Sequence, residues 1–354
     1  MIKQKDETCY LKSDLLSIPN MRRFSHEAMA TTFEIIIVHE DGRYAQQAAR
    51  AAFDELDRLE AELSRFIENS DISRINNLPA NRPLTIGLAA FECLQLSARI
   101  YNETNGAFDV TIGPLLNCWL NKDKTPGVPS ENQLNLARQR TGIHLLKLDE
   151  TMHTVQLLTS PVQIDLGGIG KGYAVDKMAE LLREWSIDTA LISGGYSSVL
   201  ALDAPPNTKG WPVTLSNPNN HKQTLAYLSL QNRAVGASGL QKGQHIIDPR
   251  TARPVQSKFA AWACAGDPAP IEPPRGCGKP DTHRPPLLLG NWCGATADAL
   301  STAFMVMSPN EIEQYCSGHP EVQALVGLQE EEKQPLGLAE RRAQREKILR
   351  FGRW

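Results

Sequence analysis

The chain has 354 residues, of which 41% are hydrophobic and 22% are charged, and its formal net charge is −3. This composition is typical of a globular protein with one large core or two modest ones, and it argues against extensive disorder. The weak negative charge, without any Lys/Arg run interleaved with aromatics, argues against nucleic acid as a partner.

Residues 1–23 predict a polar leader, because charge is scattered through them and no apolar run reaches the roughly 7 to 15 residues of a signal peptide. No stretch approaches the roughly 20 uninterrupted apolar residues of a membrane span. We therefore expect a cytoplasmic protein without an integral membrane segment.

The seven cysteines include no CxxC pair, which favours reduced thiols over a disulfide framework. Cys264, Cys277, His283 and Cys293 are close in sequence, but their spacing fits no zinc pattern.

The first regular elements are a strand and two helices. Alternation predicts a strand at 32–38, and the Asn105-Gly106 pair predicts the end of a helix over 88–103. Between these, three- and four-residue spacing predicts a long helix with a core-facing stripe. The stripe comprises Ala45, Ala48, Ala52, Phe53, Leu56, Leu59, Leu63 and Phe66.

The middle of the chain is predicted to contain a strand, a glycine turn and a helix within residues 162–185. Five candidate strands separated by Gly, Pro and Asn turns then follow between 189 and 247. Since strands and helices are grouped rather than alternated, we expect an α+β fold with mixed or antiparallel sheets packed with helices.

Seven prolines within 261–292 predict a large Pro-rich loop insertion that carries none of the core. Helical periodicity resumes at ATADALSTAFMVM, and the charged residues 328–354 predict a solvated tail or a docking helix. The main domain is therefore expected at 24–327.

The first candidate site is the turn DLGGIGKG at 165–172. Glycines at the start of a helix let backbone N–H groups and the helix dipole approach an anion such as phosphate. Lys171 adds a positive charge, and Asp165 offers a hydrogen-bond acceptor. A packing turn with a solvent-facing lysine would give the same pattern.

The second candidate site lies in ATADALSTAF, where Asp298, Ser301 and Thr302 are spaced to share one helical face. A carboxylate and hydroxyls suit Mg²⁺, which keeps waters and substrate phosphates as its other ligands. Alternatively, Asp298 is a first-turn carboxylate favoured by the helix dipole.

The third candidate is His245 in HIIDPRTARPV. A histidine with a pKa near neutrality is the usual general base for a hydroxyl. A lone histidine is, however, more often structural, and the Asp-Pro-Arg-Thr turn needs no function to explain it.

Several motifs in order resemble the ApbE family of FAD:protein FMN transferases, formerly described as thiamine-biosynthesis lipoproteins. The resemblance covers about residues 29–326. Its motifs are MATTF, LSRF with SDISRIN, GAFDVTIGPL, DLGGIGKGYAVD, SGG, ASG, HIIDPRT and ATADALSTAF.

The resemblance implies an ApbE-like fold and a role for each matching residue. His245 matches the histidine proposed as base, Gly168 the residue whose carbonyl binds the metal, and Asp298 a metal ligand that catalysis needs. Ser301 and Thr302 match the rest of the metal-ligand region. The FAD-lining positions match Met29, Phe66, Ala107, Phe108, Asp109, Asp165, Lys171 and Ile247.

The implied reaction is magnesium-dependent transfer of FMN from FAD to a Thr or Ser hydroxyl of a target flavoprotein, with release of AMP. The alternatives are an FAD pyrophosphatase that releases FMN and AMP, and a non-catalytic FAD-binding protein. Two residues depart from the family pattern: Ala252 replaces a glycine, and Tyr196 stands where an acidic residue is common. Most of the family is exported, whereas the N-terminus here predicts no export.

Overall fold

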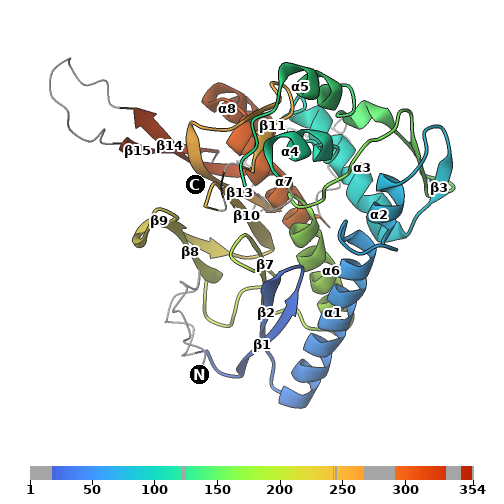
Figure 1. Cartoon of the computed structure of the whole chain (residues 1–354). Coiled ribbons are helices and arrows are strands. Elements are labelled where there is room, and N and C mark those ends of the chain that lie inside the picture. The colour runs from blue at the N-terminus through green and yellow to red at the C-terminus, as the bar shows by residue number, and fades with distance from the viewer. Residues whose placement is uncertain are drawn as a thin grey trace, which may run out of the picture.

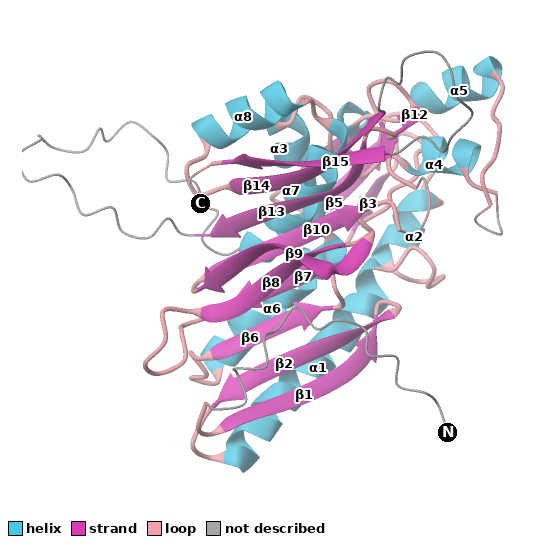
Figure 2. Ribbon diagram, turned by 90° about the vertical axis from the view of Figure 1, so that its left-hand side faces the viewer, coloured by secondary structure: helices cyan, strands magenta, loops and turns pink. Residues whose placement is uncertain are grey.

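The computed structural model describes residues 18–121, 125–241, 243, 245–266, 292–331 and 344–352. Eight of the described strands form one antiparallel sheet in the order β1-β2-β6-β7-β10-β13-β14-β15 (Figure 2). They are β1 (Met21–Ala28), β2 (Thr31–Val38), β6 (Ala190–Gly194), β7 (Ser198–Ala201), β10 (Arg233–Gly239), β13 (Lys258–Gly266), β14 (Gln323–Glu331) and β15 (Gln344–Phe351). The expected α+β class is confirmed.

Three helices, α1 (Gly42–Leu63), α6 (Gly170–Glu184) and α7 (Cys293–Val306), cover one face of this sheet (Figure 1). Asp41 starts α1 by accepting hydrogen bonds from the N–H groups of Arg43 and Tyr44. The buried stripe of α1 is rich in alanine, which lets α6 pack closely against it. Helix α7 lies between α6 and strands β10 and β13, near the centre of the molecule.

The opposite face is covered by a hairpin of β8 (Trp211–Asn217) and β9 (Asn220–Leu230). Burial alternates along β8, as expected for a strand with one face on a core. Trp211 and Val213 of β8 pack there with Val199, Trp262 and other residues of the main sheet. The sheet is therefore buried on both faces over its central strands.

Smaller elements surround this frame. The helices are α2 (Asp71–Asn76), α3 (Leu88–Glu103), α4 (Gly113–Trp119), α5 (Glu131–Arg138) and α8 (Pro309–Gly318). Strands β3 (Pro83–Thr85), β5 (Thr154–Leu157) and β4 (Leu146–Asp149) form one small sheet, and β11 (Ile247–Asp248) pairs with β12 (Arg253–Pro254). No helix among the described residues is long and apolar enough to cross a membrane.

The expectation that 261–292 carries none of the core is wrong for its first six residues. Residues 261–266 belong to β13, which is buried along its whole length and pairs with β10 and β14. A strand buried on both faces does not alternate in hydrophobicity, so the neighbouring prolines dominated the pattern. Residues 267–291 lie outside the described part of the chain.

The expectation of a solvated tail or docking helix at 328–354 is also wrong for most of its described residues. Residues 344–351 form β15, the edge strand of the main sheet, in register with β14 from Ala324 to Glu331. Charged side chains are usual on an edge strand, because they discourage pairing with a further chain. At the other end, β1 begins at Met21, within the expected polar leader.

The helix stripe was wrong at its last position. Helix α1 ends at Leu63, and the Phe66 side chain is 80% exposed instead of facing the core. The other expected core-facing positions, from Ala45 to Leu63, are buried. The predicted helix over 88–103 is confirmed, and Asn105 and Gly106 adopt the left-handed conformation expected after it.

Candidate active site

The glycine turn leads into the N-terminus of α6, as the sequence predicted. Asp165 Oδ1 accepts a hydrogen bond from the N–H of Gly167 over 2.7 Å, which closes a tight turn before the helix. Helix α6 then begins at Gly170, and Lys171 lies half-buried in its first turn. The end of α6 therefore combines a positive dipole end with an ammonium group.

Gly172 has a packing role. A Cβ atom at Gly172 would lie 2.1 Å from the carbonyl oxygen of Gly294, so only glycine allows α6 and α7 to approach so closely. Because of this close approach, the face of α7 that bears Asp298 packs against the start of α6. The packing interpretation of the turn is thus correct for Gly172, and it is compatible with anion binding at the helix end.

Asp298 on α7 points at that helix end. Its Oδ2 accepts a hydrogen bond from the N–H of Gly172 over 2.8 Å, and its Oδ1 accepts one from Ser198 Oγ over 2.6 Å. Burial raises the pKa of Asp298, against the nearby charge of Lys171 and these two hydrogen bonds. Each carboxylate oxygen has two lone pairs and uses one of them in these hydrogen bonds. Both oxygens therefore keep a lone pair that could bind a cation.

A hydroxyl cluster adjoins this carboxylate. Ser238 Oγ of β10 lies 2.8 Å from Ser301 Oγ and 3.0 Å from Thr302 Oγ1. Gly168 faces the same cluster, since a Cβ atom there would lie 3.1 Å from Thr302 Oγ1. The residues that resembled a metal site thus lie together, although more than 120 residues separate Gly168 from Asp298 in sequence.

The donors suit a hard cation. Carboxylate and hydroxyl oxygens are ligands that Mg²⁺ accepts, with water and phosphate oxygens completing its shell. In the described part of the chain, no group of three or more His, Cys, Asp or Glu side chains could hold a metal ion. Of the four residues weighed for zinc, Cys277 and His283 lie outside the described residues.

The segment Ala107-Phe108-Asp109 is buried beside the glycine turn. The Phe108 ring lies against Gly168, and the N–H of Asp165 donates to the carbonyl of Val110 over 2.7 Å. Asp109 Oδ1 accepts hydrogen bonds from the N–H and the hydroxyl of Thr111. Burial raises the pKa of Asp109 to about 6, despite these hydrogen bonds.

Met29 occupies a strained hairpin turn between β1 and β2. Met29 and Ala30 both have left-handed backbone angles, with φ of 50° and 57°, where glycine or asparagine is usual. The chain after this turn contacts the β6–β7 turn, because the N–H of Gly195 donates to the carbonyl of Thr32. Such strain is frequent at functional sites.

His245 and Ile247 lie on a separate segment. The Nδ1 of His245 is 2.8 Å from the carbonyl oxygen of Gly243, whereas Ile247 is buried with Leu115 and Ala252. Among the described residues, no hydrogen bond or ion pair joins His245 to the Asp298 cluster. Ala252 keeps a left-handed φ of 59°, so this residue adopts the conformation that glycine favours.

Sequence reasoning missed two hydroxyls, those of Ser198 and Ser238. Both stand in or beside short motifs of the family resemblance, SGG and ASG, that carried no assigned role. Strand β7 and strand β10 place them under α7, a proximity that no local pattern predicts.

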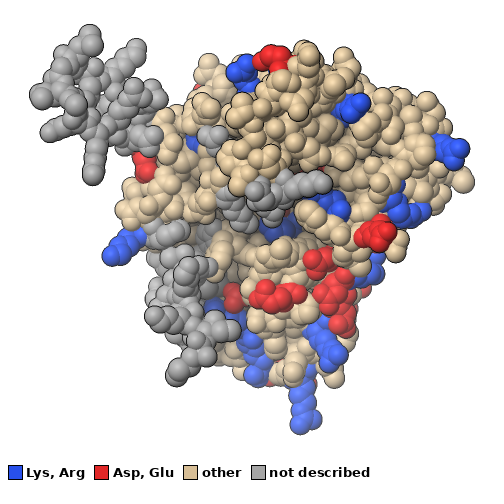
Figure 3. Space-filling model, in the orientation of Figure 1, with Lys and Arg blue, Asp and Glu red and all other residues tan. Residues whose placement is uncertain are grey.

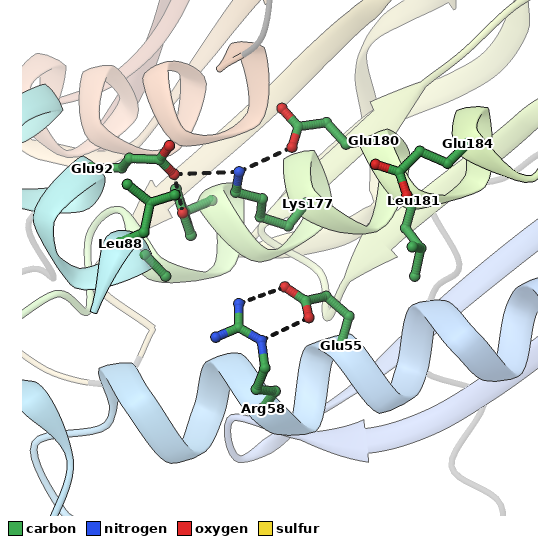
Figure 4. A pocket seen from close by; sticks show the side chains of 10 residues that line it. Glu55, Arg58, Leu88, Glu92, Lys177, Glu180, Leu181 and Glu184 are labelled. Carbon is green, nitrogen blue, oxygen red and sulfur yellow. Dashed lines mark hydrogen bonds and ion pairs between the residues drawn. The ribbon is translucent and has the colours of Figure 1, made fainter.

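A cavity of about 310 Å³ between α1, α3 and α6 lies apart from this cluster. None of the predicted site residues lines it. Figure 4 shows two ion-paired groups in its lining: Arg58 with Glu55, and Lys177 with both Glu92 and Glu180. The face of the molecule seen in Figure 3 carries acidic and basic side chains near one another, without a broad basic area. We therefore place the candidate site at α6 and α7.

Comparisons with known proteins agree with this architecture. The flavinyl transferase ApbE of Pseudomonas stutzeri superposes with a TM-score of 0.74, at 21% identity and with 94% of each chain covered. The flavin transferase ApbE of Vibrio cholerae gives a TM-score of 0.72, at 20% identity, over 93% of this chain and 96% of that one. The fold is therefore that of the ApbE flavin transferases.

Sequence comparisons identify the family. The model of the ApbE family matches residues 29–269. The FAD:protein FMN transferase of Salmonella typhimurium is 27% identical over 250 residues, 66% of this chain and 71% of the relative. That of Chlamydia muridarum is 30% identical over 223 residues, 60% of this chain and 67% of the relative. The chain belongs to the ApbE family.

Proposed function

We propose that this protein transfers FMN from FAD to a Thr or Ser hydroxyl of a target flavoprotein and releases AMP. The observation that carries the proposal is the contact of Asp298 with the N–H of Gly172, which joins a cation-binding carboxylate to an anion-binding helix end. The flavin and the protein acceptor are inferred from the relatives, which are named FAD:protein FMN transferases.

Mg²⁺ is the metal that we propose for this site. Asp298, Thr302 and Ser301 would hold it with side-chain oxygens, and Gly168, which lies against Thr302, would add its carbonyl. When bound, the ion would neutralise charge on the pyrophosphate oxygens of FAD. Ser301 contributes through a hydroxyl that now donates to the Asp298 carbonyl over 2.8 Å.

Lys171 and the N-terminus of α6 would neutralise the remaining charge on the pyrophosphate. An ammonium group and a helix dipole at fixed positions stabilise charge that develops during phosphoryl transfer. Phe66, Asp165 and the 107–109 segment are proposed to hold the rings and ribityl chain of FAD, with Met29 and Ile247 at the edges of the site.

His245 is the proposed base. Because its Nδ1 faces a carbonyl oxygen, Nδ1 must be the nitrogen that carries the hydrogen, which leaves Nε2 with a free lone pair in the neutral ring. The acceptor hydroxyl would lose its proton to Nε2 as its oxygen attacks the FMN-side phosphorus. The bond between that phosphorus and the bridging oxygen then breaks, and AMP leaves with that oxygen.

One incubation tests the proposal. The protein is mixed with FAD, Mg²⁺ and a peptide that carries a flavinylation motif of the family, and AMP release and peptide mass are followed. We expect the peptide to gain the mass of an FMN group together with stoichiometric AMP. AMP without a mass gain would identify an FAD pyrophosphatase, and neither product would leave only non-catalytic FAD binding.

A further inference from the structure

Arg65 has no role in the site described so far, and it lies beside Phe66 on the turn that follows α1. Helix α1 ends at Leu63, and the next residues turn back through hydrogen bonds from Ile67 N–H to the Ser64 carbonyl and from Phe66 N–H to Ser64 Oγ. Ser70 Oγ also donates to the Ser64 carbonyl over 2.6 Å. These bonds fix the direction in which Arg65 leaves the backbone.

The Arg65 guanidinium contacts two of the proposed FAD-binding residues. Its Cζ lies 4.8 Å from the ring centroid of Phe66, within the range of a cation–π contact. Its terminal nitrogen lies 3.3 Å from Asp165 Oδ2. One planar cation thus joins an aromatic ring at the end of α1 to a carboxylate that starts the glycine turn.

Burial does little to hold Phe66 in place. The residue is 80% exposed, so the Arg65 contact adds to a position that packing leaves weakly determined. The Arg65 side chain is 31% exposed and that of Asp165 is 17% exposed. The guanidinium is therefore partly shielded on the side of Asp165, and the ring remains available for stacking on a flat ligand.

Asp165 connects Arg65 to the phosphate end of the site. Its Oδ1 accepts a hydrogen bond from the N–H of Gly167, whereas its Oδ2 faces Arg65. Both oxygens of this carboxylate are therefore held, one by the turn and one by the guanidinium. Movement of Asp165 would alter the turn that leads to Gly168 and Lys171.

We propose that Arg65 is a positioning residue for FAD, which holds the Phe66 ring and the Asp165 carboxylate in the arrangement that receives the dinucleotide. The inference rests on the proposed function, because FAD is the ligand that it assigns to these residues. A planar guanidinium can stack on the ring and pair with the carboxylate in one fixed geometry, which an ammonium group reproduces only in part.

The test is the affinity for FAD, measured by flavin fluorescence, together with kcat and KM for FAD in the peptide assay. We expect Arg65→Ala to raise Kd and KM for FAD about tenfold, since two contacts are lost, while kcat stays within about twofold. Arg65→Lys keeps the charge and should recover only part of the affinity. The thermal midpoint of both variants should stay near that of the wild type.

Arg58→Ala is the matched control, because Arg58 also pairs with carboxylates on α1 but lies in the separate cavity. It should leave FAD affinity unchanged. A double-mutant cycle with Asp165→Asn tests the path: if Arg65 acts through Asp165, the combined loss of affinity is smaller than the product of the two single losses.

The outcomes separate this inference from the proposed function. If the wild type transfers FMN and Arg65→Ala binds FAD as tightly, the role of Arg65 is overturned and the function stands. If the wild type binds FAD without transfer, the function falls, and the FAD affinity of the variants still decides the role of Arg65. A wild type that binds no FAD overturns both.

Discussion

Ser198 Oγ donates a hydrogen bond of 2.6 Å to Oδ1 of Asp298, and this bond joins the start of β7 to the middle of α7. Both residues are buried, so the hydroxyl replaces water that the carboxylate would otherwise bind. Together with the N–H of Gly172, Ser198 orients the carboxylate toward the start of α6. The orientation of the proposed metal ligand is thus determined by residues of three elements.

Ser198→Ala should therefore weaken the apparent affinity for magnesium. A hydrogen bond to a charged group contributes about 1.5–3 kcal/mol, so we expect the concentration of Mg²⁺ at half-maximal turnover to rise at least about tenfold. The measurement is AMP release against Mg²⁺ concentration. Ser197→Ala is the control, because the described contact of Ser197 uses its backbone carbonyl. An unchanged magnesium curve in Ser198→Ala would contradict this role.

Asp298→Asn should separate function from stability. The amide keeps the shape of the carboxylate but loses the charge that binds a cation, so we expect turnover to fall at least about a hundredfold. Because burial raises the pKa of Asp298, removal of the charge should not lower the free energy of unfolding. AMP release and urea unfolding are the two measurements. Normal turnover with normal magnesium dependence would rule out Asp298 as a ligand.

The raised pKa of Asp109 predicts how the free energy of unfolding depends on pH. Its folded pKa, about 6, lies above the ordinary value of 3.8, so the folded state binds the proton more tightly than the unfolded state does. This proton stabilises the folded state fully below about pH 4, and its contribution is lost as pH rises through 6. The total loss in the free energy of unfolding is about 3 kcal/mol. Urea unfolding at pH 4.5 and pH 7 should detect about 2 kcal/mol of this loss, because the unfolded carboxyl is already largely ionised at pH 4.5.

Asp109→Asn provides the comparison for that measurement. The variant cannot titrate, so its free energy of unfolding should fall less between the two pH values than that of the wild type. Equal changes in both proteins would show that other groups dominate. Asp109 is 7% exposed, so solvent screening reduces the effect little.

Lys258 is expected to stabilise α7, the helix that bears Asp298. Its ammonium is buried and donates to the carbonyl of Phe304 over 2.7 Å, and also to that of Met307, at the C-terminal end of α7. Burial lowers the pKa of Lys258 to about 8. Lys258→Met leaves two carbonyls without this donor, so we expect a loss of about 1–3 kcal/mol in the free energy of unfolding.

Chemical denaturation checks that loss, with the exposed Lys147→Met as control. A stability equal to the wild type would mean that the cost of burying the ammonium cancels the two hydrogen bonds. The expected loss would instead show that Lys258 caps α7 and so supports the helix that bears Asp298.

The amphipathic elements could be predicted from the sequence because their pattern is local. The helix over 88–103 and the β-rich region from 189 to 247 needed only hydrophobic spacing and turn residues. The strand at 261–266 could not be predicted this way, since it is buried on both faces. The edge strand β15 is charged, and only its pairing with β14 makes it a strand.

The candidate site follows the same division. From the sequence alone came the glycine turn, Lys171 and the shared face of Asp298 and Thr302, because these depend on spacings of a few residues. The tertiary structure brought that face onto the start of α6, since glycine at 172 permits contact with Gly294. It alone placed Ser198, Ser238 and Arg65 beside these groups, because hydrogen bonds between distant segments leave no local pattern.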